Sequence, residues 1–156
     1  MKAIKVEQIM TPNPACCLRD DFVQVAANIM RRLDVGIVPV VDTLGPQGKL
    51  VGVITDRDLC LGVIAEARDP NLTRVRDLMT KDLVVAKPAE SMEHVLAHMR
   101  RAKVRRIPVV NDDFSIVGMV SLGDVVRDRA TPEGEVCKTL AAISAPTTHK
   151  KMAHAA

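Results

Sequence analysis

The heptapeptide GVITDRD at residues 52–58 recurs as GMVSLGD at residues 118–124. Both copies reduce to a glycine, two apolar residues, a hydroxyl residue, two variable positions and an aspartate. Beyond this motif, residues 6–41 align with residues 75–110 at a constant offset of 69, and ten of the 36 aligned pairs are identical. Three residues are then dropped from the segment 42–49, and the match resumes at an offset of 66. The chain is therefore predicted to hold two copies of one unit of about 60 residues.

Each copy shows the same order of predicted elements. Apolar residues recur at helical spacing over residues 22–33 and again over residues 92–102, which predicts an amphipathic helix in each copy. A short extended segment precedes each helix, and two β-branched runs separated by turn residues follow it, as expected for a hairpin. The extended segments are 15–18 and 83–86, and the paired runs are 37–41 with 50–54 and 107–110 with 116–120. A second helix is expected after Thr55 and after Ser121, so the order strand, helix, strand, strand, helix occurs twice.

A unit of this size buries too little apolar surface to be comfortably stable alone, so the two copies should pack against each other. The predicted fold is α+β, with two β-α-β-β-α units related by a pseudo-twofold axis. We assign residues 1–70 to the first unit, 71–130 to the second, and 131–156 to a short C-terminal helix and a flexible tail. Such packing leaves two related clefts between the units, where small ligands usually bind.

The composition argues against several classes of function. The 156 residues include no tryptophan, no tyrosine and two phenylalanines, so the chain lacks the aromatic platforms on which single-stranded nucleic acids stack. The net charge is only +3, and a nucleic-acid partner is therefore not expected. Neither a membrane span nor a signal sequence is recognised, which predicts a cytoplasmic protein. The four cysteines lack Cys-x-x-Cys spacing, and we expect them to be reduced thiols.

The repeated motif has two interpretations from its residues alone. A hydroxyl residue followed three positions later by an acid is close to a capping box, in which the acid bonds back to the start of a helix. The acid is Asp in both copies, however, where a capping box prefers Glu or Gln. A hydroxyl group at a helix N-terminus also suits a phosphate, and an Asp one turn later can accept two hydrogen bonds from a ribose diol. Both interpretations remain open at this point.

The repeated unit resembles the cystathionine β-synthase (CBS) domain, and the two copies resemble a CBS pair over about residues 6–127. The resemblance rests on Met-Thr at 10–11 and 79–80, on an apolar-Pro step before each second strand, and on the motif in both copies. It implies a regulatory module without enzymatic activity that binds an adenosine-containing ligand in the cleft. AMP, ADP or ATP is the first expectation, with NAD or S-adenosylmethionine as alternatives. It also implies a homodimer that acts on an effector protein, whose identity the sequence does not give.

The same resemblance implies a ligand site in each cleft. At the first site, Thr55 would hold phosphate or ribose oxygens and Asp58 would hold ribose hydroxyls; at the second site, Ser121 and Asp124 would do the same. The walls around adenine would come from the strands and the segments that precede them. These wall residues are Thr11, Cys16, Val38, Pro39, Thr80, Val84, Ile107 and Pro108. A proline cannot donate to a sheet ladder, so neighbouring backbone groups are left free to read a base edge, although a proline that simply starts a strand explains both copies equally well.

The basic residues differ between the two copies. Arg105 and Arg106 precede the Ile-Pro step of the second copy, where the first copy has Gly36-Ile37. Arg57 lies inside the first motif, where the second copy has Gly123. Across a pseudo-twofold cleft these arginines would meet a phosphate held at the first site, because guanidinium groups offer paired donors. We therefore expect the first site to be the tighter one and the second to be weak or empty, while a solvated run of charge is the alternative.

Two other features give weaker signals. His94 and His98 lie four residues apart on one predicted helix face, a spacing that can bind metal. We assign no acidic or cysteine ligand beside them, and therefore expect partly buried or interface histidines and no metal. No nucleophile–base–acid set and no phosphate-binding glycine loop is recognised, so we assign no catalytic residues.

After Thr131 the chain leaves the repeat. Apolar residues at 136, 140 and 143 predict a short helix that packs on a dimer partner or another protein, and residues 147–156 are predicted to be disordered. An adaptor or dimerisation module with vestigial ligand sites is the alternative to a nucleotide sensor.

Overall fold

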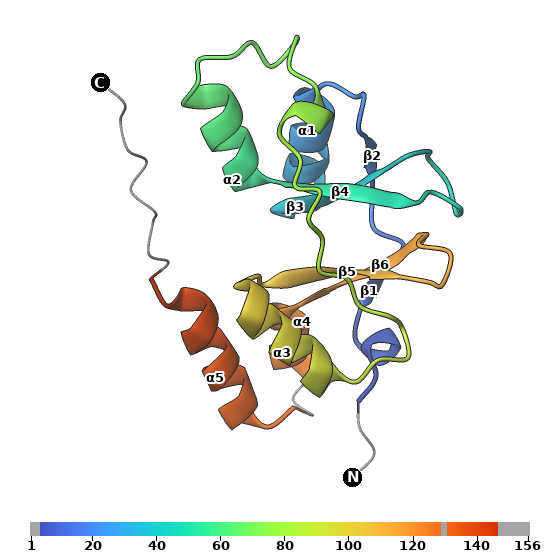
Figure 1. The fold of residues 1–156 in the computed structure, drawn as a ribbon, viewed down its shortest axis with the longest axis vertical. Coiled ribbons are helices and arrows are strands. Elements are labelled where there is room, and N and C mark those ends of the chain that lie inside the picture. Colours follow the sequence, from blue (N-terminus) through green and yellow to red (C-terminus); the bar gives the residue numbers. More distant parts are fainter. Residues whose placement is uncertain (1–3, 129–130, 147–156) are drawn as a thin grey trace.

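The computed structural model describes residues 4–128 and 131–146, which fold into two sheet-and-helix units facing each other (Figure 1). One three-stranded sheet has the order β2-β3-β4 and the other has the order β1-β6-β5. Their strands are β1 (Thr11–Pro12), β2 (Cys17–Leu18), β3 (Ile37–Val41), β4 (Leu50–Thr55), β5 (Arg106–Val110) and β6 (Ile116–Ser121). β3 pairs with β4, and β5 with β6, as antiparallel hairpins. Both predicted hairpins are confirmed.

The helices follow the predicted pattern closely. Helices α1 (Val23–Leu33) and α3 (Met92–Ala102) are the two amphipathic helices, and each ends at a left-handed residue, Asp34 or Lys103. In the first copy, α2 (Asp56–Leu59) continues into the π-helical segment η2 (Cys60–Ile64); in the second copy, α4 (Leu122–Asp128) is regular. The 3-10 turns are η1 (Val6–Gln8) and η3 (Val75–Asp77), and the last helix is α5 (Glu133–Ser144).

The extended segments before α1 and α3 are shorter than predicted. Residues 15–18 form only the two-residue β2, which lies parallel to β3. Residues 83–86 form no named strand, and a single parallel bridge joins Ala86 to Val109. Few residues here can join the ladder because each segment leaves the sheet to reach its helix.

The two units exchange their leading segments. Strand β1 comes from the start of the chain but pairs with β6 of the second copy, and Thr80 makes the corresponding bridge to Val53 of the first copy. The buried side chains follow this exchange. Val6 packs in the core beneath α3, whereas Val75 packs in the core beneath α1. The exchange ties the two units together through both backbone and core.

The exchanged segments explain why each motif needs a glycine. A Cβ built on Gly52 would lie 2.8 Å from the sulfur of Met79 and 3.0 Å from the carbonyl oxygen of Thr80. A Cβ on Gly118 would lie 2.5 Å from the sulfur of Met10 and 3.2 Å from the carbonyl oxygen of the next residue. The Met-Thr step of one copy therefore lies directly on the glycine of the other. The repeated Met-Thr step and the repeated glycine are the two sides of the same contact between the copies.

Helix α5 packs on its own chain, beside α3 (Figure 1). Val136 and Ile143 lie against the core that contains Val95 and Leu96, while Leu140 is half exposed. The expected helix is confirmed, but its apolar face covers α3 of the same chain, where a partner was expected, because an adjacent apolar surface is available within the chain. Residues 147–156, predicted to be disordered, lie outside the described residues. Within the described ranges, no helix is long and apolar enough to cross a membrane.

Candidate functional site

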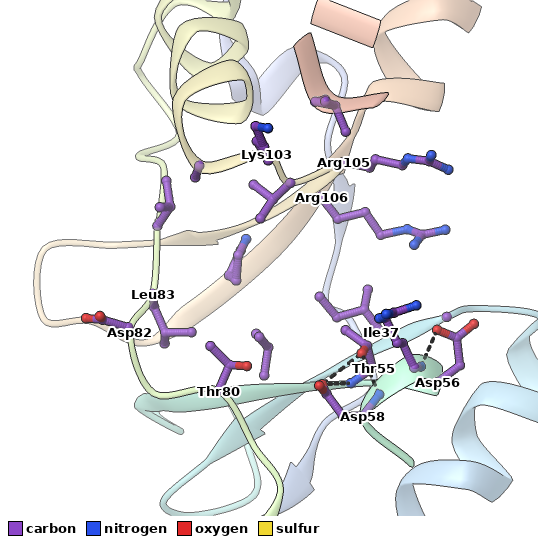
Figure 2. Close-up of a pocket in the computed structure, with 18 residues that line it drawn as sticks. Ile37, Thr55, Asp56, Asp58, Thr80, Asp82, Leu83, Lys103, Arg105 and Arg106 are labelled. Carbon is purple, nitrogen blue, oxygen red and sulfur yellow. Dashed lines mark hydrogen bonds between the residues drawn. The ribbon is translucent and has the colours of Figure 1, made fainter. Parts of the chain in front are cut away.

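The larger cavity, of about 660 Å³, lies between the two units and is built from both copies. Copy one contributes the end of β4 and the start of α2, with Thr55, Arg57 and Asp58. Copy two contributes Thr80 and residues 82–84, together with Arg105, Arg106 and Pro108. Figure 2 shows the labelled arginines on the wall opposite Thr55 and Asp58. The cavity brings together, across the pseudo-twofold cleft, polar residues that the sequence analysis assigned to the first site.

The capping interpretation of the motif is correct in both copies. Thr55 Oγ1 accepts a hydrogen bond from the Asp58 amide at 3.1 Å, and Asp58 Oδ2 accepts from both the amide and the hydroxyl of Thr55 at 2.8 Å. Ser121 and Asp124 form the same set of bonds. The cap holds each carboxylate at the edge of its cavity. Because the cap uses only Oδ2, it does not exclude a second role for the other carboxylate oxygen.

The second cavity, of about 490 Å³, is the pseudo-symmetric counterpart. It is lined by Ser121 and Asp124 of copy two and by Thr11 and Pro39 of copy one. Here Arg127 donates to Asp124 Oδ1, so both oxygens of this carboxylate are engaged. At the first site, Asp58 Oδ1 accepts no hydrogen bond from any described residue, since the equivalent of Arg127 is Leu61. The two cavities therefore differ at the atom that a ribose hydroxyl would address.

The charge of the two cavities also differs. Four cationic and three carboxylate side chains line the first cavity, whereas two of each line the second. Part of the difference comes from Lys103, whose counterpart in the second cavity is Asp34. Another part comes from Arg105, whose counterpart in the first copy is Gly36. A Cβ on Gly36 would lie 2.9 Å from Asp56 Oδ2 and 3.6 Å from a guanidinium nitrogen of Arg106. Arg106 therefore reaches across the cleft to the backbone of Gly36, and the absence of a side chain at Gly36 leaves room for the Asp56 carboxylate.

Most of the residues anticipated from the sequence line one of the two cavities. Those at the first cavity are Thr55, Arg57, Asp58, Thr80, Val84, Arg105, Arg106 and Pro108. Those at the second are Thr11, Pro39, Ser121 and Asp124, and Arg106 borders this cavity as well. The side chains of Val38 and Ile107 are fully buried in the two cores and line neither cavity. They precede a proline on an alternating strand, which turns each valine or isoleucine inward while the proline faces the cleft.

Cys16 also lies outside both cavities, and Ala15 lines the second cavity next to it. The Cys16 thiol donates to the Pro14 carbonyl at 3.3 Å, and burial raises its pKa to about 11. Burial, with the nearby charge of Asp21, raises the pKa of Cys17 to about 12. Both are neutral thiols in packed surroundings, as expected for cysteines that have a structural role.

Five charged residues at the cavities were not anticipated. Asp56, Asp82 and Lys103 line the first cavity, and Asp34 and Arg127 line the second. Lys103 had a sequence signal, because it lies within the basic segment 100–106 that also carries Arg105 and Arg106. Arg127 follows its motif aspartate by one helical turn, a spacing at which side chains on a helix meet.

Comparison with known proteins agrees with this architecture. A family model described as the CBS domain matches residues 6–64 and 75–130. The chain is 36% identical over 128 residues to the CBS domain-containing protein YhcV of Bacillus subtilis, covering 82% of this chain and 87% of that protein. This chain is also 33% identical over 130 residues to inosine-5'-monophosphate dehydrogenase of Methanocaldococcus jannaschii. That match covers 83% of this chain but only 23% of the enzyme.

A solved structure adds a ligand complex to the comparison. The CBS domain pair of protein MJ0100, in complex with 5'-methylthioadenosine and S-adenosyl-L-methionine, matches with a TM-score of 0.69 at 27% identity. The match covers 81% of this chain and 95% of that chain. Taken with the two aligned repeats and their exchanged leading segments, these matches show that the chain belongs to the CBS domain family and that its two CBS domains form an α+β CBS pair.

Proposed function

We propose that this protein is a regulatory module that binds an adenine nucleotide, with AMP, ADP or ATP as the ligand class, in the first cavity. The proposal rests on one observation, that a single cavity is lined by residues of both copies. Thr55 and Asp58 come from the first copy, and Arg105 and Arg106 come from the second. A sugar diol and a phosphate need these two kinds of group at opposite ends of a cleft.

The remaining walls suit a purine held without aromatic stacking. Ile37, Val53, Val84 and Pro108 supply aliphatic surface around the polar groups. Such a lining gives apolar contact to both faces of a base, while backbone groups next to the proline are available to its edge. The arrangement favours a nucleoside whose base is read by the backbone.

The cations distinguish a phosphate ligand from the alternatives. Methylthioadenosine carries no phosphate and S-adenosylmethionine carries a positive sulfonium, so neither gains from Arg57, Lys103, Arg105 and Arg106 as a phosphate does. The ligands named for the MJ0100 pair make them the alternatives to test first, together with NAD. We expect the cationic wall to favour ligands with one or more phosphates.

A ligand in this cavity would touch both copies and thereby favour one arrangement of them over others. We expect the signal to pass through a homodimer or to an effector protein in the cytoplasm, with no catalytic step in this chain. Leu61 and Ile64 of η2, which are at least half exposed, offer apolar surface for such association.

Calorimetric titration tests this proposal. AMP, ADP, ATP, S-adenosylmethionine and NAD are titrated separately into the full chain, first checked by its 260 nm absorbance for co-purified nucleotide. We expect one tight site per chain for an adenine nucleotide. Arg105→Gly, which installs the residue of the first copy, should weaken that ligand about tenfold to a hundredfold, the loss of a charged hydrogen bond. If no ligand releases heat or raises the melting temperature at millimolar concentration, the adaptor alternative replaces the sensor.

A further inference from the structure

A second cluster of ligand-forming side chains lies at the start of α3, and none of its members lines either of the two cavities. Glu90, just before the Ser91 cap, is followed by His94 and His98 at successive intervals of four residues. The ligand atoms of all three lie within 4.8 Å of one another. His94 Nδ1 lies 3.3 Å from Glu90 Oε1, and the two imidazole centroids are 4.9 Å apart. The earlier expectation that no acidic ligand lies beside these histidines is therefore wrong.

One nitrogen of this cluster has no partner. His98 Nδ1 is fully buried and makes no hydrogen bond within the described part of the chain. A ring nitrogen taken out of water and left unpaired carries a desolvation cost. A cation bound by one ring nitrogen would fix the orientation and the tautomer of the His98 imidazole, and the other ring nitrogen would then carry the proton.

The carboxylate is already held in position. Glu90 has a side chain that is 17% exposed, and its Oε2 accepts from the amide of Lys87 at 3.1 Å, which leaves Oε1 facing His94. The His94 side chain is 66% exposed and can rotate. Ligand atoms around a tetrahedral zinc lie ~3.3 Å apart, given Zn–N distances of about 2.0–2.1 Å. Rotation of this one exposed ring is a small adjustment compared with a change of backbone.

The first copy shows that the fold does not require these histidines. Asp21 takes the place of Glu90 and accepts from the Leu18 amide at 2.8 Å, so the carboxylate cap is common to both copies. The positions of His94 and His98 are occupied there by Val25 and Ile29. The two imidazoles are additions to a helix that folds in the other copy with aliphatic side chains.

We propose that Glu90, His94 and His98 form a site for a divalent transition metal of the zinc class. The two imidazoles suit Zn²⁺ or Co²⁺ better than Ca²⁺ or Mg²⁺, and a carboxylate is a common third ligand of zinc. Three protein ligands leave a coordination position for water or for a side chain of an associated protein. The positive end of the α3 dipole opposes a cation here, and the Glu90 carboxylate beside His94 offsets it.

The test uses full-length, untagged protein that has been treated with a chelator. Zn²⁺ is titrated by calorimetry, and Co²⁺ by its visible absorption, which reports the coordination geometry. His94→Val and His98→Ile install the residues of the first copy, so the helix should fold in both variants. The matched control is Glu93→Gln, which changes a neighbouring carboxylate outside the cluster.

We expect one Zn²⁺ per chain, affinity reduced at least tenfold in each histidine variant, and no change in the control. Thermal melting should show that the variants are folded and that Zn²⁺ raises the melting temperature only of the wild type and the control. Absence of binding to the wild type would overturn the proposal. Equal binding to the His94→Val/His98→Ile double variant would also overturn it, since the metal would then be held by other groups, such as the tail histidines.

Discussion

Gly52 and Gly118 have no side chain because the backbone of the other copy's Met-Thr step passes close to them. Each lies in a strand facing the Met-Thr step of the other copy, with a carbonyl oxygen 3.0–3.2 Å from where a Cβ would be. A methionine can move its flexible end, but a paired backbone cannot move without disturbing the exchanged segments. The glycines therefore report on contact between the copies.

Gly52→Ala and Gly118→Ala should each lower the free energy of unfolding by about 1–3 kcal/mol, the usual cost of overpacking. Urea denaturation measures the loss. Gly134→Ala is the control, because it lies in α5 with open space around its Cβ, and it should be neutral or stabilising by up to ~1 kcal/mol. Equal effects at all three positions would show that the crossing backbone does not constrain the motif glycines.

The cysteines divide into two reactivity classes. Burial raises the pKa of Cys16 to about 11 and that of Cys17 to about 12, whereas Cys60 and Cys137 are exposed. The thiolate is the reactive form, so at pH 8 iodoacetamide should label Cys60 and Cys137 first, as read by mass spectrometry of the peptides. Labelling of Cys16 and Cys17 should rise only as the pH approaches their raised pKa values or the protein unfolds. Early labelling of Cys16 would contradict the buried environment described for it.

Helix α5 is tied to α3 by one arginine. Arg100 donates to Glu135 Oε2 at 3.1 Å and to the buried Thr139 hydroxyl at 2.9 Å. The Lys138 hydrogen bond lowers the pKa of Glu135, and Arg100 adds to the same effect. Ile143 of this helix lines the first cavity, so the arginine also fixes part of the cavity wall.

Arg100→Ala should loosen α5 without unfolding the CBS pair. We expect faster amide hydrogen exchange over residues 133–144 and a loss of about 1–2 kcal/mol from the removed charged hydrogen bonds. Arg101→Ala, at the exposed neighbouring position, is the control and should leave the exchange of α5 unchanged. If the two variants exchange alike, Arg100 does not hold α5, which is then fixed by its apolar contacts and by the hydrogen bond from Lys103 Nζ to the Ala145 carbonyl.

The repeat alone predicted much of the molecule, including two hairpins, the helices α1 and α3, and clefts shared between copies. It did so because periodicity and turn residues are local signals that each copy repeats. The exchange of leading segments was not predictable in the same way. The sequence places Val6 at the head of the first copy, but only packing decides that this valine enters the core beneath α3.

The candidate site was predictable to the extent that it depends on matching positions in the two copies. Thr55 and Asp58 were anticipated because the motif recurs as Ser121 and Asp124, and Arg105 because the first copy has a glycine in its place. Arg127 was missed, since it lies outside the motif and acts through the helical turn that brings it to Asp124. Val38 and Ile107 were misplaced because strand alternation, which turns them into the core, was not applied to the apolar-Pro step.

The two capping aspartates allow a matched comparison of the two cavities. Asp58→Ala and Asp124→Ala remove the same capping box, which costs about 0.5–2 kcal/mol of stability in either copy. They differ in the second carboxylate oxygen, which is open to a ligand at Asp58 and engaged by Arg127 at Asp124. Any difference in binding between two equally destabilised variants therefore belongs to the cavity.

Calorimetric titration of both variants with the adenine nucleotide that binds the wild type most tightly is the decisive measurement. We predict that Asp58→Ala abolishes the tight site or weakens it at least tenfold, while Asp124→Ala retains wild-type affinity and one site per chain. Unchanged binding in Asp58→Ala, or loss of binding only in Asp124→Ala, would contradict the assignment of the ligand to the first cavity.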